Sequence, residues 1–472
     1  MFADFVSTQK YIADNQVKMV DLKFTDLWGR WHHVTVPASA FTPDLMTDGV
    51  GFDGSSVGLK SVKSGDMALI PELSTGFLDP FTDVPTLSFL CNTVEADTKS
   101  IFRRDPRQIA KNAERFLVES GIAGNSSWGP EFEFYIFSSA SFNNTINHVN
   151  YHFESEEAFW NSAAYSSGDF IPKHGGYHAI PPRDKHFNLR TQIVLALEQA
   201  GVPVKYHHHE VGGPGQCEIE TPMLGLPQAA DASMLIKYFV KMTCAQAGQT
   251  ATFLPKPLYG EAGSGMHFHQ QLFSKTTNLF YNPSSPNLLS KTALYYIGGL
   301  LKHAPSVMAF TNPTSNSYRR LVPGYEAPVN SFFSTGNRSA AIRIPKYATK
   351  PEMVRFEFRP PDATCNPYLA IAAMLLAGID GIQKKIDPTV EGFGPIDENI
   401  FAWSPERRKS IKSLPTSLEE ALHALQQDYE YLTSAGIFED DLINDWVLAK
   451  EKELSELRGR PHPFEIENYF DF

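Results

Sequence analysis

Two glutamates stand two residues apart in the segment PEFEFYIF, residues 130–137, whose other members are proline, aromatic residues and isoleucine. This composition favours a β-strand, in which residues i and i+2 point to the same face of the sheet. Glu131 and Glu133 are therefore expected to look into one space. Like charges held this close repel each other, which points either to a solvated sheet face or to cations bound between the carboxylates.

Two more segments place glutamates in a strand pattern. Residues 207–220, HHHEVGGPGQCEIE, predict two short strands joined by a glycine-rich turn that brings Glu210 and Glu218 close together. Residues 354–360, VRFEFRP, place Glu357 with two arginines on one face and two phenylalanines on the other.

Histidines follow the same period of two in residues 263–270, GSGMHFHQ, with His267 and His269 on one face and Met266 and Phe268 on the other. A solvated face explains any one of these segments. It does not favour Glu and His with so little Lys, Ser or Thr among them. The four segments together therefore predict a lined cavity.

Crowded carboxylates are stable when hard divalent cations lie between them, because such ions take oxygen ligands and cancel the repulsion. Glutamates with one or two histidines suit Mg²⁺ or Mn²⁺ better than zinc, for which thiolates or several histidines are expected. Six arginines between residues 319 and 359 would hold an anionic substrate. Two metals beside an arginine cluster indicate phosphoryl transfer.

The elements that would position these residues mix strands and helices, so we expect an α+β fold in two units, residues 1–103 and 104–472. Residues 138–178 are predicted to be a long loop, and Ser417 with Glu420 predicts a capping box. Strands are predicted at 17–26, 31–37 and 86–94, and helices at 105–120, 189–201 and 366–386.

Composition limits the functional classes. A net charge of −12 argues against a general nucleic-acid or acidic-membrane binder. The four cysteines are dispersed, which fits reduced thiols better than disulfides or a zinc site. No secretory signal is visible at the N-terminus and no apolar run is long enough to span a bilayer, so a cytoplasmic location without membrane attachment is expected.

Seven segments carry a resemblance to a known family. In order they are FDGSS (52–56), GPEFEF (129–134), HHHEV (207–211), KPLYGEAGSGMHFH (256–269), NSYRRLVPGYEAPV (316–329), NRSAAIRIP (337–345) and RFEFRPPDATCNPYLA (355–370). In this order and spacing, the chain resembles type I glutamine synthetase over essentially its whole length.

The resemblance implies a β-grasp domain over residues 1–103 and a catalytic domain over residues 104–472, whose antiparallel strands form a funnel surrounded by helices. It also implies ATP-dependent ligation of ammonia to the γ-carboxylate of glutamate through γ-glutamyl phosphate. The partners would be glutamate, ammonium and ATP. The assembly would be a dodecamer of two stacked hexameric rings, with active sites shared between neighbours and the C-terminal segment HPFEIENYFDF buried in the opposite ring.

The same resemblance assigns six residues to two bound Mg²⁺ or Mn²⁺ ions. One ion would be held by Glu133, Glu210 and Glu218, and the other by Glu131, His267 and Glu357.

Substrate contacts are also implied by the resemblance. Arg320 and Arg359 would hold the carboxylates of glutamate, and the backbone at Gly263 its amino group. The phosphates of ATP would be held by Arg338, Arg343, Arg355 and His269.

Two further residues are expected to be catalytic with Arg338. Glu326 would lie on a flap that closes over the intermediate and excludes water. Asp53, from a neighbouring subunit, would take a proton from ammonium, because ammonium has no lone pair with which to attack. The alternative for Asp53 is that it only caps a turn.

The chain departs from the family pattern at three places. Ala262 stands where many members have asparagine, so a side-chain contact is lost there. Phe401 occupies the position of the tyrosine that is adenylylated in one branch, so no adenylylation is expected at that site. The segment after FDGSS lacks the arginine used for feedback inhibition in the other branch.

Three other functions remain open on the sequence. A γ-glutamyl ligase could use an organic amine or polyamine in place of ammonia. A non-catalytic assembly could keep the fold, although all six expected metal positions are acidic or histidine. A dimetal phosphate-ester hydrolase would turn over ATP without glutamate or ammonia.

Overall fold

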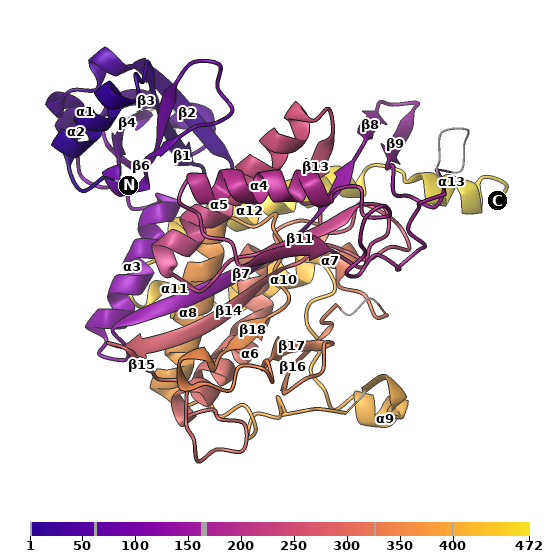
Figure 1. The fold of residues 1–472 in the computed structure, drawn as a ribbon. Helices are drawn as coiled ribbons and strands as arrows, with labels where there is room; N and C mark the ends of the chain where they lie inside the picture. The colour runs from indigo at the N-terminus through magenta and orange to yellow at the C-terminus, as the bar shows by residue number, and fades with distance from the viewer. Residues whose placement is uncertain (1, 61–63, 162–167, 325–326, 399) are drawn as a thin grey trace.

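The chain folds into a small N-terminal domain and a larger domain built around one extended sheet (Figure 1). The computed structural model describes residues 2–60, 64–161, 168–324, 327–398 and 400–472, without the side chains at 401 and 405. The α+β class is confirmed. The connection between the two domains runs from the end of β6 at Glu95 to the start of α3 at Pro106.

The N-terminal domain holds a six-stranded mixed sheet in the order β2-β1-β6-β4-β3, with β5 also paired to β6. β1 and β6 run parallel, and the other pairs are antiparallel. The predicted strands at 17–26, 31–37 and 86–94 are confirmed as β1, β2 and β6. The elements are α1 (Phe5–Asp14), β1 (Met19–Thr25), β2 (Trp31–Pro37), α2 (Pro43–Asp48), β3 (Val50–Asp53), β4 (Asp66–Pro71), β5 (Phe77–Leu78) and β6 (Thr86–Glu95).

The larger domain is organised on a ten-stranded sheet in the order β10-β11-β7-β14-β18-β17-β16, with β12 and β13 paired to β7 and β15 to β14. All its pairs are antiparallel except β16 with β17. The strands are β7 (Asn125–Phe137), β10 (Tyr206–His209), β11 (Gln216–Glu220), β12 (Leu224–Gly225), β13 (Thr250–Thr252), β14 (Met266–Ser274), β15 (Thr277–Asn278), β16 (Asn330–Ser334), β17 (Ala340–Arg343) and β18 (Phe356–Phe358).

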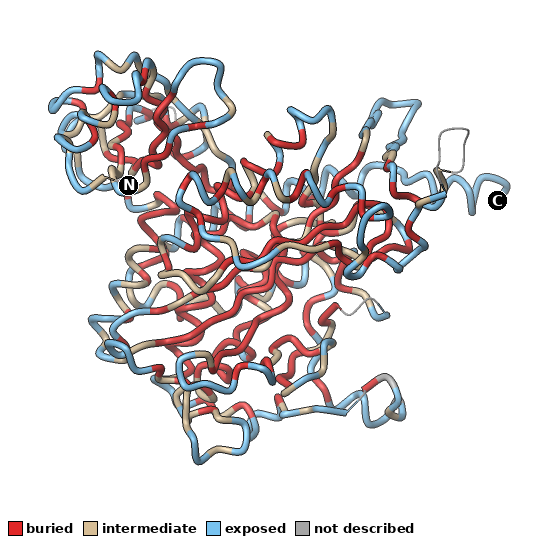
Figure 2. The backbone as a smooth tube through the Cα atoms, viewed as in Figure 1, coloured by how far each residue is buried: buried red, intermediate tan, exposed pale blue. Residues whose placement is uncertain are grey.

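Alternation along these strands gives the sheet one apolar face. Phe132, Phe134, Phe268 and Phe358 are completely buried in the core, while the charged residues between them point to the other face. Burial is concentrated along the central strands, and residues 455–472 at the C-terminal end are exposed (Figure 2).

Helices cover the apolar face. α6 and α8 lie side by side, and a Cβ added at Gly299 of α6 would stand 2.5 Å from Gly381 Cα of α8, so glycine permits their close approach. The longer helices are α3 (Pro106–Glu119), α4 (Phe187–Gln199), α5 (Leu226–Gln246), α6 (Lys291–Thr311), α8 (Pro367–Lys384), α10 (Leu418–Gln427) and α12 (Asp440–Arg458), and the short ones are α7 (Ser317–Arg320), α9 (Pro405–Arg408), α11 (Glu430–Thr433) and α13 (Pro463–Tyr469).

The predicted helices at 105–120, 189–201 and 366–386 are confirmed as α3, α4 and α8. Two local expectations were wrong. The segment 138–178 contains a hairpin, β8 (Ser139–Asn144) with β9 (Val149–Glu154), whose polar sequence hides its strand pattern. At α10, Ser417 accepts a hydrogen bond from the Glu420 backbone, but the Glu420 carboxylate binds Thr416 and leaves the capping box incomplete.

Within the described part of the chain, no helix combines the length and the hydropathy needed to cross a bilayer.

Candidate active site

A cavity of about 480 Å³ opens over the charged face of the large sheet. Its lining is rich in residues of opposite charge that come from β7, β10, β11, β14, β17, α7 and the connecting loops. The charged and histidine residues that line it are Glu131, Glu133, Glu210, Glu218, His174, His208, His267, Arg320, Arg338, Arg343 and Arg359.

Strand register explains why the glutamates meet. Glu218 of β11 pairs with Glu133 of β7, and Glu220 pairs with Glu131, so four carboxylates form two adjacent cross-strand pairs. On the other side of β7, His267 of β14 pairs with Glu131. Directly opposed like charges destabilise a sheet, so this arrangement has to be compensated from outside the two strands.

Crowding among these carboxylates shows in their pKa values. Burial, and then the charges of Glu133 and Glu218, raise the pKa of Glu210 well above its usual range. Burial, with Glu131 and Glu133, does the same for the pKa of Glu218. A divalent cation would favour the ionised carboxylates and remove the repulsion. The oxygen-rich donor set therefore fits a hard cation.

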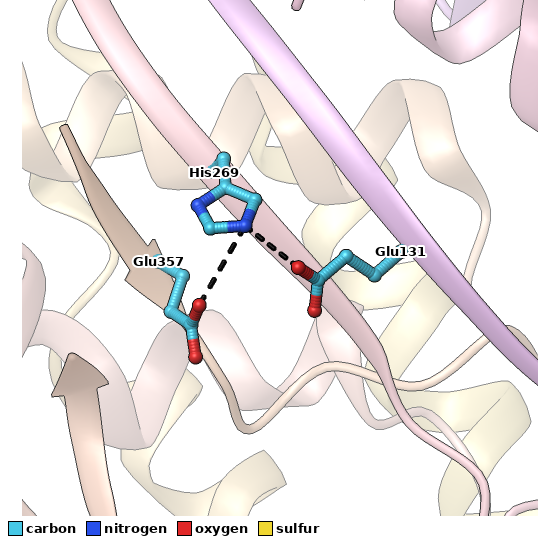
Figure 3. A group of neighbouring side chains, drawn as sticks. All are labelled: Glu131, His269 and Glu357. Atoms are coloured by element: carbon cyan, nitrogen blue, oxygen red, sulfur yellow. Dashed lines mark hydrogen bonds and ion pairs between the residues drawn. The ribbon is translucent and has the colours of Figure 1, made fainter. Parts of the chain in front are cut away.

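Histidines balance the neighbouring carboxylate of Glu131. His269 Nε2 lies 2.7 Å from Glu131 Oε1 and 3.6 Å from Glu357 Oε2 (Figure 3). His267 Nδ1 lies 3.0 Å from the other oxygen of Glu131. Burial alone would raise the pKa of Glu131, but His269 and His267 together lower it well below its usual range.

Arginines balance Glu357, which is fully buried. Arg343 donates two hydrogen bonds of 2.8 Å to its carboxylate, and Arg359 donates one of 2.5 Å. Burial opposes ionisation of Glu357, but Arg359 and the other nearby cations outweigh it and lower the pKa to about 2. Glu357 therefore stays a carboxylate.

Among the described residues, three groups of side chains could each hold a metal ion. Within each group, the ligand atoms lie within 4.8 Å of one another. The groups are Glu131, His269 and Glu357; His208, Glu210 and Glu218; and Glu131, Glu218 and Glu220.

These sets overlap the two expected ligand sets without matching them. His269 stands beside Glu131 and Glu357, where the resemblance assigns His267, and His267 Nε2 lies 3.3 Å from Arg320 Nη2. Glu133 accepts a 2.6 Å hydrogen bond from the Gly265 backbone. The division of ligands between two ions stays a prediction.

Arg320 is buried beside the cavity, where it donates to the carbonyl oxygens of Pro360 at 2.7 Å and Arg359 at 3.1 Å. Gly263 lines the cavity, and its carbonyl oxygen accepts a 2.9 Å hydrogen bond from Gln216. These hydrogen bonds hold Arg320 and Gly263, two residues expected to bind glutamate, at the cavity wall.

Four of the described residues expected in the site do not line the cavity. Two of them, His269 and Glu357, lie beside the lining residue Glu131. Arg355 does not line the cavity, but its guanidinium donates a 3.1 Å hydrogen bond to the hydroxyl of Tyr347, which does.

Asp53 lies in the N-terminal domain, at the end of β3, and does not line the cavity of its own chain. Glu326 lies outside the described residues.

Asp53 caps the short helix η2 (Gly54–Val57) and is exposed. The hydroxyls of Ser56 and Ser55, with the Ser55 backbone, donate to its two oxygens at 2.6 to 2.9 Å. The Ser56 hydroxyl first, and then Ser55, lower the pKa of Asp53. The carboxylate is thus an exposed turn cap whose hydrogen bonds favour its ionised form.

Glu220 belongs to the group of carboxylates on β7 and β11 but was not predicted from the sequence. It is 1% exposed and pairs with Lys205 at 2.6 Å. The signal was present, because Glu220 continues the period of two from Glu218. Two cavity residues without a charge, Tyr177 and Tyr206, were also missed, since aromatic residues in loops and strand ends give no distinctive pattern.

Comparisons with known proteins agree with this geometry. Residues 16–96 match the profile of the glutamine synthetase β-grasp domain, and residues 103–469 match that of the glutamine synthetase catalytic domain. A glutamine synthetase of Streptomyces filamentosus is 46% identical, with all of both chains covered. One from a Nostoc species is 45% identical over 98% of each chain.

Solved structures show the same fold. The glutamine synthetase of Plasmodium falciparum superposes with a TM-score of 0.90 at 28% identity, covering 99% of each chain. A structure of GmaS with ADP gives a TM-score of 0.81 at 25% identity, covering 98% of this chain and 99% of that one.

The fold and the cavity thus define a two-domain enzyme scaffold with a carboxylate-lined site on an antiparallel sheet. The chain belongs to the glutamine synthetase family.

Glu218→Gln tests whether the carboxylates are crowded. Because the pKa values of Glu210 and Glu218 are raised in the fold, their contribution to stability is complete below about pH 4.3 and is lost as pH rises through the raised values. Near neutral pH, the metal-free variant should therefore melt at a higher temperature than the metal-free wild type. Mn²⁺ should raise the melting temperature of the wild type and that of the variant much less.

Thermal unfolding with EDTA and with Mn²⁺ measures both effects. Glu119→Gln, on an exposed turn of α3, is the control and should change neither. A Glu218→Gln variant that is less stable without metal and keeps its full response to Mn²⁺ would contradict this explanation.

Proposed function

We propose that this protein is a glutamate–ammonia ligase, which forms glutamine from glutamate and ammonia and converts ATP to ADP and phosphate. Membership of the glutamine synthetase family over the full chain supports this activity. The observation that carries it is the cavity itself, in which four glutamates face four arginines. Carboxylates suit divalent cations and guanidiniums suit phosphate and carboxylate groups.

The glutamates and histidine in and beside the cavity would bind divalent cations. Mg²⁺ or Mn²⁺ would be held by Glu133, Glu210 and Glu218 on one side, and by Glu131, His267 and Glu357 on the other. Bound there, the cations would neutralise charge on the phosphates of ATP.

The chain's own groups then favour formation of γ-glutamyl phosphate. Arg320 and Arg359 would hold the two ends of glutamate so that its γ-carboxylate faces the γ-phosphate of ATP. Attack by this carboxylate forms the mixed anhydride and releases ADP. The charge that develops on the transferring phosphoryl group would be stabilised by Arg338 and Arg343, with His269 and Arg355 holding the remaining phosphates.

The second half of the reaction needs ammonia in place of water. An ionised Asp53 attracts ammonium and would accept its proton as ammonia attacks the activated carbonyl, releasing phosphate. Glu326, on the segment expected to close over the site, would help to exclude water and protect the anhydride from hydrolysis.

The exposed position of Asp53 supports a shared active site. Since its carboxylate lies outside the cavity of its own chain, it would serve a neighbouring subunit, as in the expected dodecamer of two hexameric rings. Exposed aromatic and aliphatic side chains on the C-terminal segment, Phe464, Ile466, Tyr469, Phe470 and Phe472, support contact with another subunit. A cytoplasmic location fits this role in nitrogen assimilation.

Phosphate release tests the reaction. With ATP and Mg²⁺ or Mn²⁺, release should require both glutamate and ammonium and should be matched by glutamine formation. Glu357→Gln should lower the rate by at least about a hundredfold, because it removes an expected ligand and the partner of two arginines.

Amine controls separate the alternatives. Consumption of putrescine or ethylamine in preference to ammonium would indicate an organic-amine ligase. Phosphate release without glutamate would indicate a hydrolase, and no turnover with either metal would indicate a non-catalytic assembly.

Mixed oligomers test the shared site. Asp53→Asn and Glu357→Gln should each be nearly inactive alone, because each variant lacks one required carboxylate in every site. After the two variants are dissociated, mixed and reassembled, some sites should combine an intact Asp53 with an intact Glu357 and recover activity. Two variants that stay inactive after verified co-assembly would place both residues in the site of one chain.

A further inference from the structure

A buried carboxylate lies behind the metal-facing strands, outside the cavity. Glu157 is fully buried, in the segment that follows the β8–β9 hairpin. Its Oε1 accepts a 2.6 Å hydrogen bond from the Lys185 backbone, and its Oε2 lies 3.0 Å from His209 Nε2. A charged group without solvent is retained only where it is paired and hydrogen-bonded, as Glu157 is.

His209 connects this carboxylate to the cavity wall. The ring is fully buried at the end of β10. One nitrogen, Nε2, faces Glu157, and the other, Nδ1, lies 2.6 Å from the backbone carbonyl oxygen of Glu210. Both ring nitrogens therefore have oxygen partners, and the ring is held from two sides.

The backbone of Glu210 is fixed by this contact. Its amide donates a 2.8 Å hydrogen bond to the Gln216 carbonyl, and its carbonyl faces His209. Its side chain enters the cavity beside His208 and Glu218. Rotation of this peptide would move the carboxylate away from them.

The chain at Gly176 and His178 also packs closely against the same peptide. The Gly176 amide donates to the Val211 carbonyl at 3.1 Å, and the His178 amide donates to the His209 carbonyl at 3.0 Å. A Cβ added at Gly176 would stand 2.3 Å from the Glu210 carbonyl oxygen and 2.6 Å from His209 Nδ1. A side chain at position 176 would therefore displace the Glu210 peptide or the His209 ring.

We propose that His209, anchored by Glu157, is a positioning residue that holds the Glu210 backbone and so directs the Glu210 carboxylate to a divalent cation. This positioning role rests on the proposed function only because it takes Glu210 as a metal ligand. Partners that orient a ligand from behind typically change metal affinity by about ten- to a hundredfold when they are lost. Glu157 thus contributes to metal binding from outside the cavity lining.

Two substitutions of His209 separate its two contacts. His209→Asn places an amide nitrogen near the position of Nδ1 and can keep the contact with the Glu210 carbonyl. His209→Gln places one near Nε2 and can keep only the contact with Glu157. Mn²⁺ binding to the assembled protein, without nucleotide or glutamate, is measured by the electron paramagnetic resonance of free Mn²⁺.

The expected order of Mn²⁺ affinity is wild type, then His209→Asn, then His209→Gln, with the last weakened by about ten- to a hundredfold. Glu157→Gln should weaken affinity in the wild-type background and change it little in the His209→Asn background, where the link is already broken.

His303→Gln is the matched control. His303 is 4% exposed and lies 2.9 Å from Asp380 and 2.8 Å from Asp428 in the helical layer. Its loss should lower the melting temperature without changing Mn²⁺ affinity.

Any other pattern of Mn²⁺ affinities overturns the positioning role. Equal Mn²⁺ affinity in all variants contradicts it whatever the activity, and equal losses in His209→Asn and His209→Gln indicate a packing role only. A wild type that binds no Mn²⁺ removes its basis. If the Mn²⁺ affinities follow the expected order but the wild type makes no glutamine, the positioning role is supported and the proposed function is contradicted.

Discussion

Repulsion among buried carboxylates is the constraint on which the rest of this structure depends. Glu131, Glu133, Glu218 and Glu220 face one another across two hydrogen-bonded strands, where neither strand can turn its side chains away without reversing its whole apolar face. Like charges in such positions destabilise the sheet. The cost is tolerated because the remaining elements supply compensating cations or hold the carboxylates ready for bound ones.

The compensation differs along the sheet. Near β18, Glu357 is neutralised by Arg343 and Arg359, and its pKa falls to about 2. Near β11, no arginine reaches Glu210 or Glu218 among the described contacts, and their pKa values rise. The carboxylate of Glu357 is therefore already neutralised by arginines, whereas Glu210 and Glu218 would be stabilised by a bound cation. This asymmetry favours binding of a divalent cation beside Glu210 and Glu218.

Much of the site could be predicted from the sequence because its geometry is local. A period of two places Glu131 with Glu133 and His267 with His269, and strand alternation does not depend on the rest of the fold. What joins distant segments could not be predicted in this way. The cross-strand partner of Glu131 depends on register, and the buried pair of Glu157 with His209 joins residues 52 positions apart. The β8–β9 hairpin was missed because exposed polar strands lack the apolar alternation that marks buried ones.

In the proposed reaction, the γ-carboxylate of glutamate itself attacks ATP in this cavity. The most direct test uses glutamate labelled with heavy oxygen in its γ-carboxylate, with ATP, ammonium and Mg²⁺, and mass analysis of the released phosphate. We predict that each phosphate carries one labelled oxygen and that the amide of glutamine keeps the other. Unlabelled phosphate, whether or not glutamine is formed, would contradict this reaction.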